Sequence, residues 1–429
     1  MEMISRTLTK IFVSCLAVVA WLIFVFISAF YGWWMRPVAE AGNTNGFFEY
    51  ATATLEENNS PGNSAILLID AGQIVAEYYS DSAKQIDEDT VFSTASLSKW
   101  ITAIGIMKLV QDGLVELDRP ASSYLSRWEF PASDFDTSLV TVRHLLSHTA
   151  GLTDGLGFGD YAADEDLPSL EQALSNPRVS DGNTVSLAIN NKPGETWQYS
   201  GGSYLVLELI VEEVTGQSFE SYIDKSLFTQ IGMHRSGFAY LEDYDNNAGS
   251  YDSDGNPVPS YKYASSAATA FVTSASDLGK LVRSQIPGSG IENILSTKTL
   301  SLMLQPHGRA AGADIWGLGT MLYAPTEDGD HVYGHDGGNE PAINSTARIN
   351  PATGDAIIVL VTGNPNLATR IGSQWVLWQT GYPDFLDVEA VVSSMVLPMI
   401  TGSGLILIAV FYIVAIKKRK TKKMQHQHD

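Results

Sequence analysis

Two long apolar runs lie near the ends of the chain, and hydrophobic and polar positions alternate over short distances between them. Residues 11–31 contain no charged side chain, and residues 391–416 are interrupted only by Pro398 and small residues. Each run is long enough to cross a bilayer as a helix. We therefore expect one transmembrane helix at each end of the chain.

Basic side chains flank both apolar runs on the sides that face the chain ends. Arg6 and Lys10 precede the first run, and six Lys or Arg residues follow the second within residues 417–423. Because basic flanks stay cytoplasmic, both termini are expected inside and the middle of the chain outside. The expected parts are residues 1–36 (N-terminus and first span), 37–390 (outer domain), 391–416 (second span) and 417–429 (cytoplasmic tail).

A cleaved signal peptide is the alternative for the first run, because Ala39-Glu40-Ala41 resembles a small-x-small cleavage site. The run is longer than a usual signal core, and Arg36 lies between it and that site. These two features favour an uncleaved anchor.

The middle of the chain predicts strands near both of its ends and helices between them. Residues Ser64–Ser80 form two β-rich runs around a turn at residues 70–73, which is typical of a hairpin. Strands at both ends with helices between predict an α+β domain whose terminal strands share one antiparallel sheet. Further helices are expected at residues 141–151, 205–214, 272–284 and 366–380, further strands from residue 316 to 363, and a long loop covering a site at residues 155–190.

The stretch from Val91 to Gln111 predicts an amphipathic helix, with N-cap hydroxyls from Ser93, Thr94 and Ser96. Ser96 and Lys99 lie one turn apart on it and share a face. The positive end of the helix dipole favours negative charge near Ser96. An apolar environment lowers the pKa of the Lys99 amine, so that Lys99 can act as a base. A Ser-x-x-Lys match arises by chance about once or twice in a chain of this length, so its context decides its meaning.

The net charge of the outer domain argues against some classes of binding partner. The chain carries −22, with +2 in residues 1–36, +5 in residues 391–429 and −29 in the domain between them. Such a domain should repel nucleic acid and anionic lipid head groups. The single cysteine, Cys15, lies in the first apolar run, so we expect no disulfide in the outer domain.

The sequence offers less support for two other kinds of catalytic site, that of an α/β-hydrolase and that of a zinc enzyme. No Gly-x-Ser-x-Gly elbow is present, which argues against an α/β-hydrolase. His144/His148 and His331/His335 have the four-residue spacing of zinc ligands on a helix, but His-Glu-x-x-His is absent. We therefore expect no metal and no cofactor, and interpret His148 as a hydrogen-bonding residue below the site.

Four motifs in order resemble the serine β-lactamase and penicillin-binding-protein superfamily, in its class C β-lactamase-related branch. They are STASLSKWITA, RHLLSHTAGL, PGETWQYSGGSYLVLELIVEEVTGQ and GHDGGNEPA followed by the hairpin ARINPATGDAIIVLVTG. The resemblance covers residues 64–382. It implies a β-lactamase-like antiparallel sheet flanked by helices, with a helical subdomain.

The resemblance also implies a set of catalytic roles. Ser96 would attack a carbonyl, while Lys99 and Tyr199 take and return its proton. The N–H groups of Ser96 and Gly338 would form an oxyanion hole, and Gly337 and Gly338 would let substrate approach the strand closely. When protonated, His335 would attract a carboxylate or orient the leaving group. A core tyrosine and a structural histidine are the alternatives for Tyr199 and His335.

Two departures from the superfamily pattern bear on the substrate. Gly201 stands where the Tyr-x-Asn motif usually has asparagine, and His335 replaces the lysine of true β-lactamases. Both favour an esterase or peptidase over antibiotic resistance. A literal Tyr-x-Asn at Tyr244-Asp245-Asn246 lies in a polar loop, and we interpret it as a decoy.

Together these observations predict a serine hydrolase anchored in the cytoplasmic membrane of a bacterium, with its catalytic domain on the outer, periplasmic side. Its partners would be esters, small amides or D-amino-acid cell-wall peptides, and not nucleic acid. The alternative is a non-catalytic membrane scaffold or receptor that kept the fold. The sequence does not name a protein partner.

Overall fold

The computed structural model describes residues 2–58, 61–155, 160–179, 182–310, 312–340 and 342–425. The chain divides into two compact units. One comprises Met1–Pro37 with Gly381–Asp429, and the other is Val38–Thr380.

The first unit consists mainly of two long helices, α1 (Glu2–Ala29) and α12 (Val388–Gln425). Within them, Phe12–Ala29 and Val388–Ile413 are long and apolar enough to cross a membrane, judged by length and composition. The two helices pack against each other through a small cluster of buried side chains: Val25, Ala29, Val391 and Met395.

A tryptophan of α1 packs against α12 beside Pro398, the proline inside that helix. Trp21 Nε1 donates to the carbonyl of Pro398 at 3.0 Å. A Cβ at Gly402 would lie 2.1 Å from the Trp21 ring, so only glycine leaves room for it. The small residues of the second apolar run therefore provide a notch for a side chain of the first.

An antiparallel sheet of eight strands forms the centre of the second unit, in the order β2-β1-β13-β12-β11-β10-β9-β8. The first and last strands, β1 and β13, are neighbours with Ser64 opposite Val361, so the expectation that terminal strands share one sheet is confirmed. The strands are β1 (Ser64–Asp70), β2 (Gln73–Tyr79), β8 (Gly308–Ala310), β9 (Ala313–Trp316), β10 (Met321–Pro325), β11 (His331–Asn339), β12 (Ile343–Asn350) and β13 (Asp355–Thr362).

The predicted hairpin at Ser64–Ser80 is confirmed. Its turn places Ala71 at φ 45° and Gly72 at φ 76°. Two successive positive φ angles give the turn the twist that matches a β-hairpin. Gly72 adopts its angle without steric cost, whereas Ala71 holds its angle despite its Cβ.

Helices cover both faces of the sheet. Successive side chains of a strand point to opposite faces, so the buried residues of the central strands need a covering layer on each side. Leu67 points to the face covered by α3 (Leu97–Gln111) and α9 (Ala275–Arg283) and belongs to the main hydrophobic core. Arg348 on β12 points to the opposite face, where Gly372 of α11 (Leu367–Thr380) lies against its guanidinium. The remaining helix of that face, α2 (Thr44–Glu57), was not predicted.

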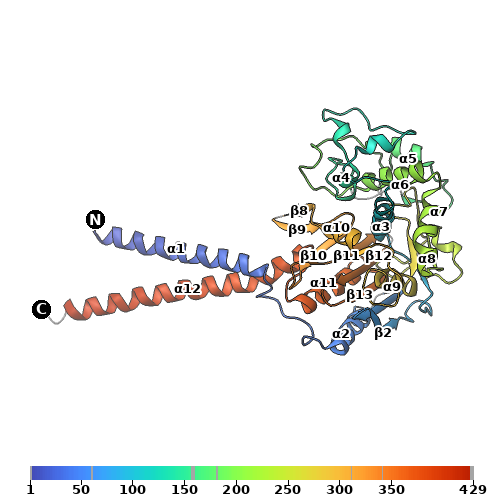
Figure 1. The fold of residues 1–429 in the computed structure, drawn as a ribbon. Coiled ribbons are helices and arrows are strands. Elements are labelled where there is room, and N and C mark those ends of the chain that lie inside the picture. The colour runs from blue at the N-terminus through green and yellow to red at the C-terminus, as the bar shows by residue number, and fades with distance from the viewer. Residues whose placement is uncertain are drawn as a thin grey trace. The chain divides into compact units, whose positions relative to one another are not determined.

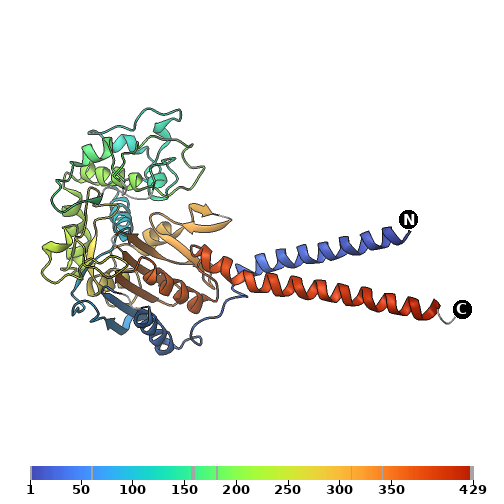
Figure 2. The same cartoon turned by 180° about the vertical axis from the view of Figure 1, so that it is seen from behind.

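A mainly helical part lies on the other side of α3 from the strands (Figure 1), and the view from behind shows the same order (Figure 2). Two small sheets accompany it, β3-β7-β5 and β4-β6. Its elements are α4 (Val142–Leu146), α5 (Leu170–Ser175), α6 (Gly201–Thr215), α7 (Phe219–Ile223), α8 (Thr229–Ile231), β3 (Val91–Ser93), β4 (Asp160–Tyr161), β5 (Ser236–Gly237), β6 (Lys262–Tyr263) and β7 (Val272–Ser274).

Two predicted helices have different limits. The helix expected to reach Gly151 ends at Leu146, because His148 adopts φ 57° and leaves the helical conformation. The helix expected from Val272 begins at Ala275, because Val272–Ser274 pair with β3 and β5 as a strand. In the second case strand pairing outweighs a helical pattern that is visible in the sequence.

The buried ion pair between β11 and β12 provides a test of the sheet. Arg348 is 1% exposed and lies 2.8 Å from the Asp336 carboxylate. Arg348→Met should lower the free energy of unfolding by about 3 kcal/mol, because the carboxylate loses its cation in a dry environment. Urea unfolding of the detergent-solubilised protein measures this loss.

The double variant Arg348→Met/Asp336→Asn is the matched control for that measurement. It should recover part of the stability, because no charge then remains unpaired. A double variant as unstable as the sum of its single changes would contradict this account.

Candidate active site

Ser96 lies at the junction between β3 and α3, and it is accessible. From Val91 to Trp100 it is the one residue that is not buried. It occupies the N-cap position, but its hydroxyl makes no capping hydrogen bond, contrary to the sequence-based expectation. The hydroxyl is therefore available for chemistry at the positive end of a helix.

The residue before Ser96 holds an unusual backbone conformation. Ala95 has φ 49°, a region that residues with a Cβ rarely adopt. Its carbonyl accepts hydrogen bonds from Ser98 N at 3.1 Å and from Ser98 Oγ at 2.7 Å. Such a conformation persists only where the surroundings enforce it, and it is common at functional sites.

The helix that follows is buried on all sides over residues 97–107, so the one-sided amphipathic pattern expected for it is wrong. Trp100 and Ile101 are fully buried, and so are the polar residues Ser98, Lys99 and Thr102. The reason is its place between the sheet and the helical part (Figure 1). Lys99, in the first turn of this helix, is therefore almost fully buried.

Burial changes the chemistry of that lysine. Lys99 is 1% exposed, and loss of solvation lowers its pKa to about 7, although the Asp154 carboxylate opposes the shift. Desolvation disfavours the ammonium form relative to the amine. A substantial fraction of Lys99 is therefore a neutral amine near pH 7.

The Lys99 amine lies among the groups that a proton transfer requires. Its Nζ is 3.3 Å from Ser96 Oγ and donates to the Ala268 carbonyl at 2.8 Å. It also lies 4.9 Å from the centre of the Tyr199 ring. The structure thus brings together three side chains that the sequence places up to 103 positions apart.

Tyr199 completes this group as a protonated phenol. Its burial raises its pKa, while its hydrogen bond with the Ser96 side chain opposes the rise. Neutral phenol can donate to one partner while it accepts from another. The ring is positioned because Ser200 is the N-cap of α6 and accepts from Ser203 N at 2.9 Å.

Asp154 is a functional candidate that the sequence reading missed. It is 3% exposed, accepts from Ser200 Oγ at 2.5 Å and from Gly202 N at 3.0 Å, and so anchors the first turn of α6 behind Tyr199. A single aspartate after HTAGLT carried no pattern that would separate it from a loop residue.

Glu208 is a second missed residue, and it supports the Lys99 contact from below. Its buried carboxyl accepts from Ala267 N at 3.0 Å and from Ser265 Oγ at 3.2 Å. Burial raises its pKa to about 8. These bonds hold the turn whose next carbonyl, that of Ala268, accepts from Lys99.

His335 lies in β11 beside the same group, but as a neutral imidazole. It is fully buried, and burial together with Lys99 lowers its pKa to about 3. Its Nδ1–H donates to the Asp336 carbonyl at 2.6 Å, and its Nε2 has no hydrogen-bond partner among the described residues. The cationic role expected for His335 does not fit this environment, whereas an uncharged hydrogen bond through Nε2 does.

His148 lies under Tyr199, as expected of a hydrogen-bonding residue below the site. Its Nδ1 accepts from Ser200 N at 3.1 Å, and its ring centre is 4.5 Å from that of Tyr199. Trp316 packs against His148, Tyr199 and His335, with ring centres 4.6, 5.6 and 5.4 Å away. This aromatic support fixes Tyr199 and His335 at one end of the site.

Gly337 and Gly338 differ in how much room their surroundings leave for a side chain. A Cβ at Gly337 would lie 2.0 Å from the Thr94 carbonyl and 3.1 Å from Ser96 N, so a side chain would push β11 away from the nucleophile. A Cβ at Gly338 would meet only ordinary contacts beyond 3.5 Å, and this residue is exposed. The close approach at Gly337 is thus between two parts of the protein, and Gly338 presents open backbone beside Ser96.

The structure also gives an outcome for the literal Tyr-x-Asn motif and for the possible metal ligands. Asn246, from the literal Tyr-x-Asn, bonds to Asp87 Oδ1 at 2.8 Å and to Thr90 Oγ1 at 2.9 Å, which is a structural role. In the described ranges, no three His, Cys, Asp or Glu side chains come together as metal ligands.

Comparison with known proteins agrees with this geometry. The Beta-lactamase family model matches residues 47–380. The esterase EstB of Burkholderia gladioli is 31% identical over 179 residues, which cover 38% of this chain and 42% of EstB. Protein flp of Staphylococcus aureus (strain MRSA252) is 25% identical over 343 residues, covering 75% of this chain and 64% of flp.

Among solved structures, the octameric penicillin-binding protein homologue from Pyrococcus abyssi superimposes with a TM-score of 0.61 at 25% identity, covering 78% of this chain and 77% of that one. The chain spans less than two thirds of the length of the curated relatives named above. The family match, by contrast, extends over nearly the whole second unit. This chain belongs to the β-lactamase family of serine hydrolases.

Proposed function

We propose that the protein is a membrane-anchored serine hydrolase that forms an acyl-enzyme on Ser96, with esters, amides or D-amino-acid cell-wall peptides as substrates. The observation that carries the proposal is the buried Lys99 amine, which lies 3.3 Å from Ser96 Oγ and whose pKa burial lowers to about 7. An activated serine needs a base within hydrogen-bond reach whose pKa is close to the working pH.

In the proposed acylation step, Lys99 Nζ takes the proton of Ser96 Oγ as Oγ bonds to the substrate carbonyl carbon. The N–H groups of Ser96 and Gly338 stabilise the oxyanion. Tyr199 donates its phenolic proton to the leaving group, whose bond to the carbonyl carbon breaks, and takes up in its place the proton that Lys99 removed from Ser96. Lys99 is then again a neutral amine and Tyr199 a neutral phenol. A water molecule then repeats the sequence on the acyl-enzyme and releases the acid and the free serine.

Two features favour ester or small amide substrates over β-lactams. Gly201 provides no side-chain amide, and the pKa of about 3 leaves His335 uncharged where a substrate carboxylate would need a cation. The similarity to an esterase agrees with this preference. The residue roles and the substrate class are proposals.

Membrane anchoring is part of the proposal. The apolar segments Phe12–Ala29 and Val388–Ile413, with basic residues at 417–423, support two spans with both termini in the bacterial cytoplasm. Residues 37–390 would then work outside the cytoplasmic membrane.

Ser96→Ala should abolish both turnover of p-nitrophenyl acetate and covalent labelling by a fluorophosphonate probe, because no nucleophile remains. The exposed Ser122→Ala is the matched control and should keep both. Circular dichroism checks that the variants fold. Labelling that survives Ser96→Ala would refute the proposed nucleophile, and a folded wild-type protein without Ser96-dependent activity would favour the scaffold alternative.

The pH dependence of kcat/KM should follow the Lys99 amine. Because only the neutral amine accepts a proton, activity should rise with pH through an apparent pKa near 7 and then level off. The raised pKa of Tyr199 keeps the phenol protonated over this range. Initial rates between pH 5 and 9, after subtraction of the Ser96→Ala rate, measure the profile, and a midpoint above 9 would contradict a desolvated base.

Glu208→Ala should lower kcat about tenfold to a hundredfold with little change in KM, because the turn that holds the Ala268 carbonyl loses its acceptor. Glu208→Gln keeps an acceptor oxygen of the same shape and should restore kcat to near the wild-type value. Equal losses in the two variants would show that Glu208 does not act by positioning this turn.

A further inference from the structure

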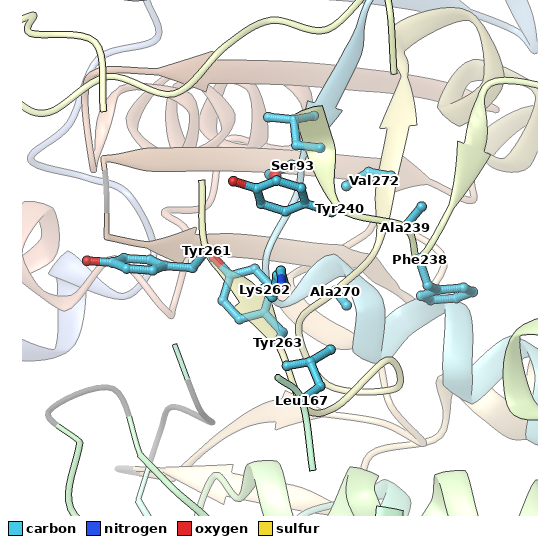
Figure 3. Close-up of a pocket in the computed structure, with 11 residues that line it drawn as sticks. Ser93, Leu167, Phe238, Ala239, Tyr240, Tyr261, Lys262, Tyr263, Ala270 and Val272 are labelled. Atoms are coloured by element: carbon cyan, nitrogen blue, oxygen red, sulfur yellow. The ribbon is translucent and has the colours of Figure 1, made fainter. Parts of the chain in front are cut away.

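A pocket with an internal volume of about 80 Å³ lies in the second unit, with four aromatic rings among its lining side chains (Figure 3). The lining includes Phe238, Tyr240, Tyr261, Tyr263, Ala270 and Val272. Small-molecule sites are typically concave and mainly apolar and aromatic with few polar groups. This composition suits a compact apolar or ring-bearing ligand.

The charged groups around the pocket are occupied within the protein. Lys262 lines it, but its Nζ donates to the Glu165 carbonyl at 2.9 Å, and Glu165 also pairs with Arg178 at 2.8 Å. The nearby Asp160 carboxylate accepts from Asn339 Nδ2 at 3.3 Å. The Glu165 carboxylate, whose pKa is lowered by its hydrogen bond with Arg178 and also by the charge of Lys262, offsets the Lys262 ammonium. An anionic ligand therefore gains little from this lysine.

Apolar side chains remain exposed at the mouth of the pocket. Leu167 is 45% exposed and Tyr261 is 37% exposed, and both line it. Large exposed apolar groups gathered at a concavity indicate a binding surface.

The pocket shares its walls with the segments that hold the catalytic group. Ser93 lines it three residues before Ser96, and Ala270 lines it two residues after the carbonyl that accepts from Lys99. Tyr263 lines it and receives a hydrogen bond on its hydroxyl from Asn339 Nδ2 at 3.1 Å. Asn339 directly follows Gly338 in β11, so the pocket begins next to the proposed oxyanion site.

The direction of β11 places the pocket on the side of the substrate's acyl group and not on the side of its leaving group. The side chains of His335 and Asn339 lie on the same face of the strand, about 13 Å apart along it. Tyr199 and His335, both packed on Trp316, mark the end where a leaving group would take its proton. A carbonyl held at Gly338 would then extend its acyl group towards Asn339 and Tyr263.

We propose that this pocket binds the acyl group of the substrate and selects uncharged aromatic or branched apolar acyl groups over acetyl and over carboxylate-bearing ones. This inference rests on the proposed hydrolase function and specifies its substrate class. Tyr261 and Ala239, at the open side of the pocket, are then specificity-determining residues.

The test compares kcat/KM of the full-length protein in detergent for the p-nitrophenyl esters of phenylacetate, acetate and succinate. Wild type should prefer phenylacetate at least about tenfold over either of the others. Ala239→Trp fills the pocket from an exposed position, and Tyr261→Ala removes one ring. Each should lower the ratio of phenylacetate to acetate at least about fivefold.

Ala352→Trp is the matched control, because this exposed alanine lies in the turn at the far end of β12 from Ile343, the partner of Asn339. It should leave the ratio as in wild type. A ratio unchanged in both pocket variants, or a wild-type preference for the succinyl ester, would overturn the assignment.

A binding measurement separates this proposal from the hydrolase function on which it rests. If wild type shows no Ser96-dependent turnover, the function fails, and ligand-observed NMR with phenylacetamide decides the pocket alone. The Kd should rise at least about fivefold in Ala239→Trp and stay unchanged in Ala352→Trp. An equal Kd in all three proteins, or no binding to any of them, would refute the pocket as an aromatic site.

Discussion

The hydrogen bond between the Lys99 amine and the Ala268 carbonyl is the interaction on which the site depends. A carboxylate in that position would stabilise the ammonium and remove the base, whereas a main-chain carbonyl orients the amine with only a partial charge. The arrangement works only in a dry surrounding. This is why α3 lies between a sheet and a helical part and is buried on every side, at the cost of an amphipathic pattern that a surface helix would show.

Two buried acidic side chains belong to the frame around the lysine, and each is engaged in hydrogen bonds of its own. Asp154 is committed to the first turn of α6 through Ser200 and Gly202, and its effect on Lys99 is too weak to offset desolvation. Glu208 is committed to the turn at residues 265–268. Asp154 and Glu208 thus hold the segments around Lys99 in place without forming an ion pair with its amine. The acceptor oxygens of both side chains are used by backbone N–H and hydroxyl donors.

Much of this fold was readable where local chemistry and long-range pairing agree. The β1–β2 hairpin has glycine at one of its two turn positions with positive φ, Gly72, and β1 pairs with β13 as expected of terminal strands. Ser96, Lys99, Tyr199 and His335 were recognisable because their motifs follow one another in order. The structure brings all four to one place.

What the sequence could not reveal depends on neighbours that are distant along the chain. Glu208 looks like an ordinary polar position of a helix until the turn at 265–268 is packed over it. The strand at Val272–Ser274 exists only because β3 and β5 lie beside it. The charge of His335 likewise depends on its burial beside Lys99, which no motif encodes.

Because the lysine is held by a main-chain carbonyl, the side chain at position 268 carries none of that contact. The sequence at this position can drift among small residues during evolution while the catalytic geometry stays intact. An alanine scan would also pass over it, since the residue is already alanine and the interacting atom is common to all twenty amino acids. Loss of function would instead arise from insertions or deletions within the turn at residues 265–268, which Glu208 holds, so the length of this turn is under stronger constraint than its composition.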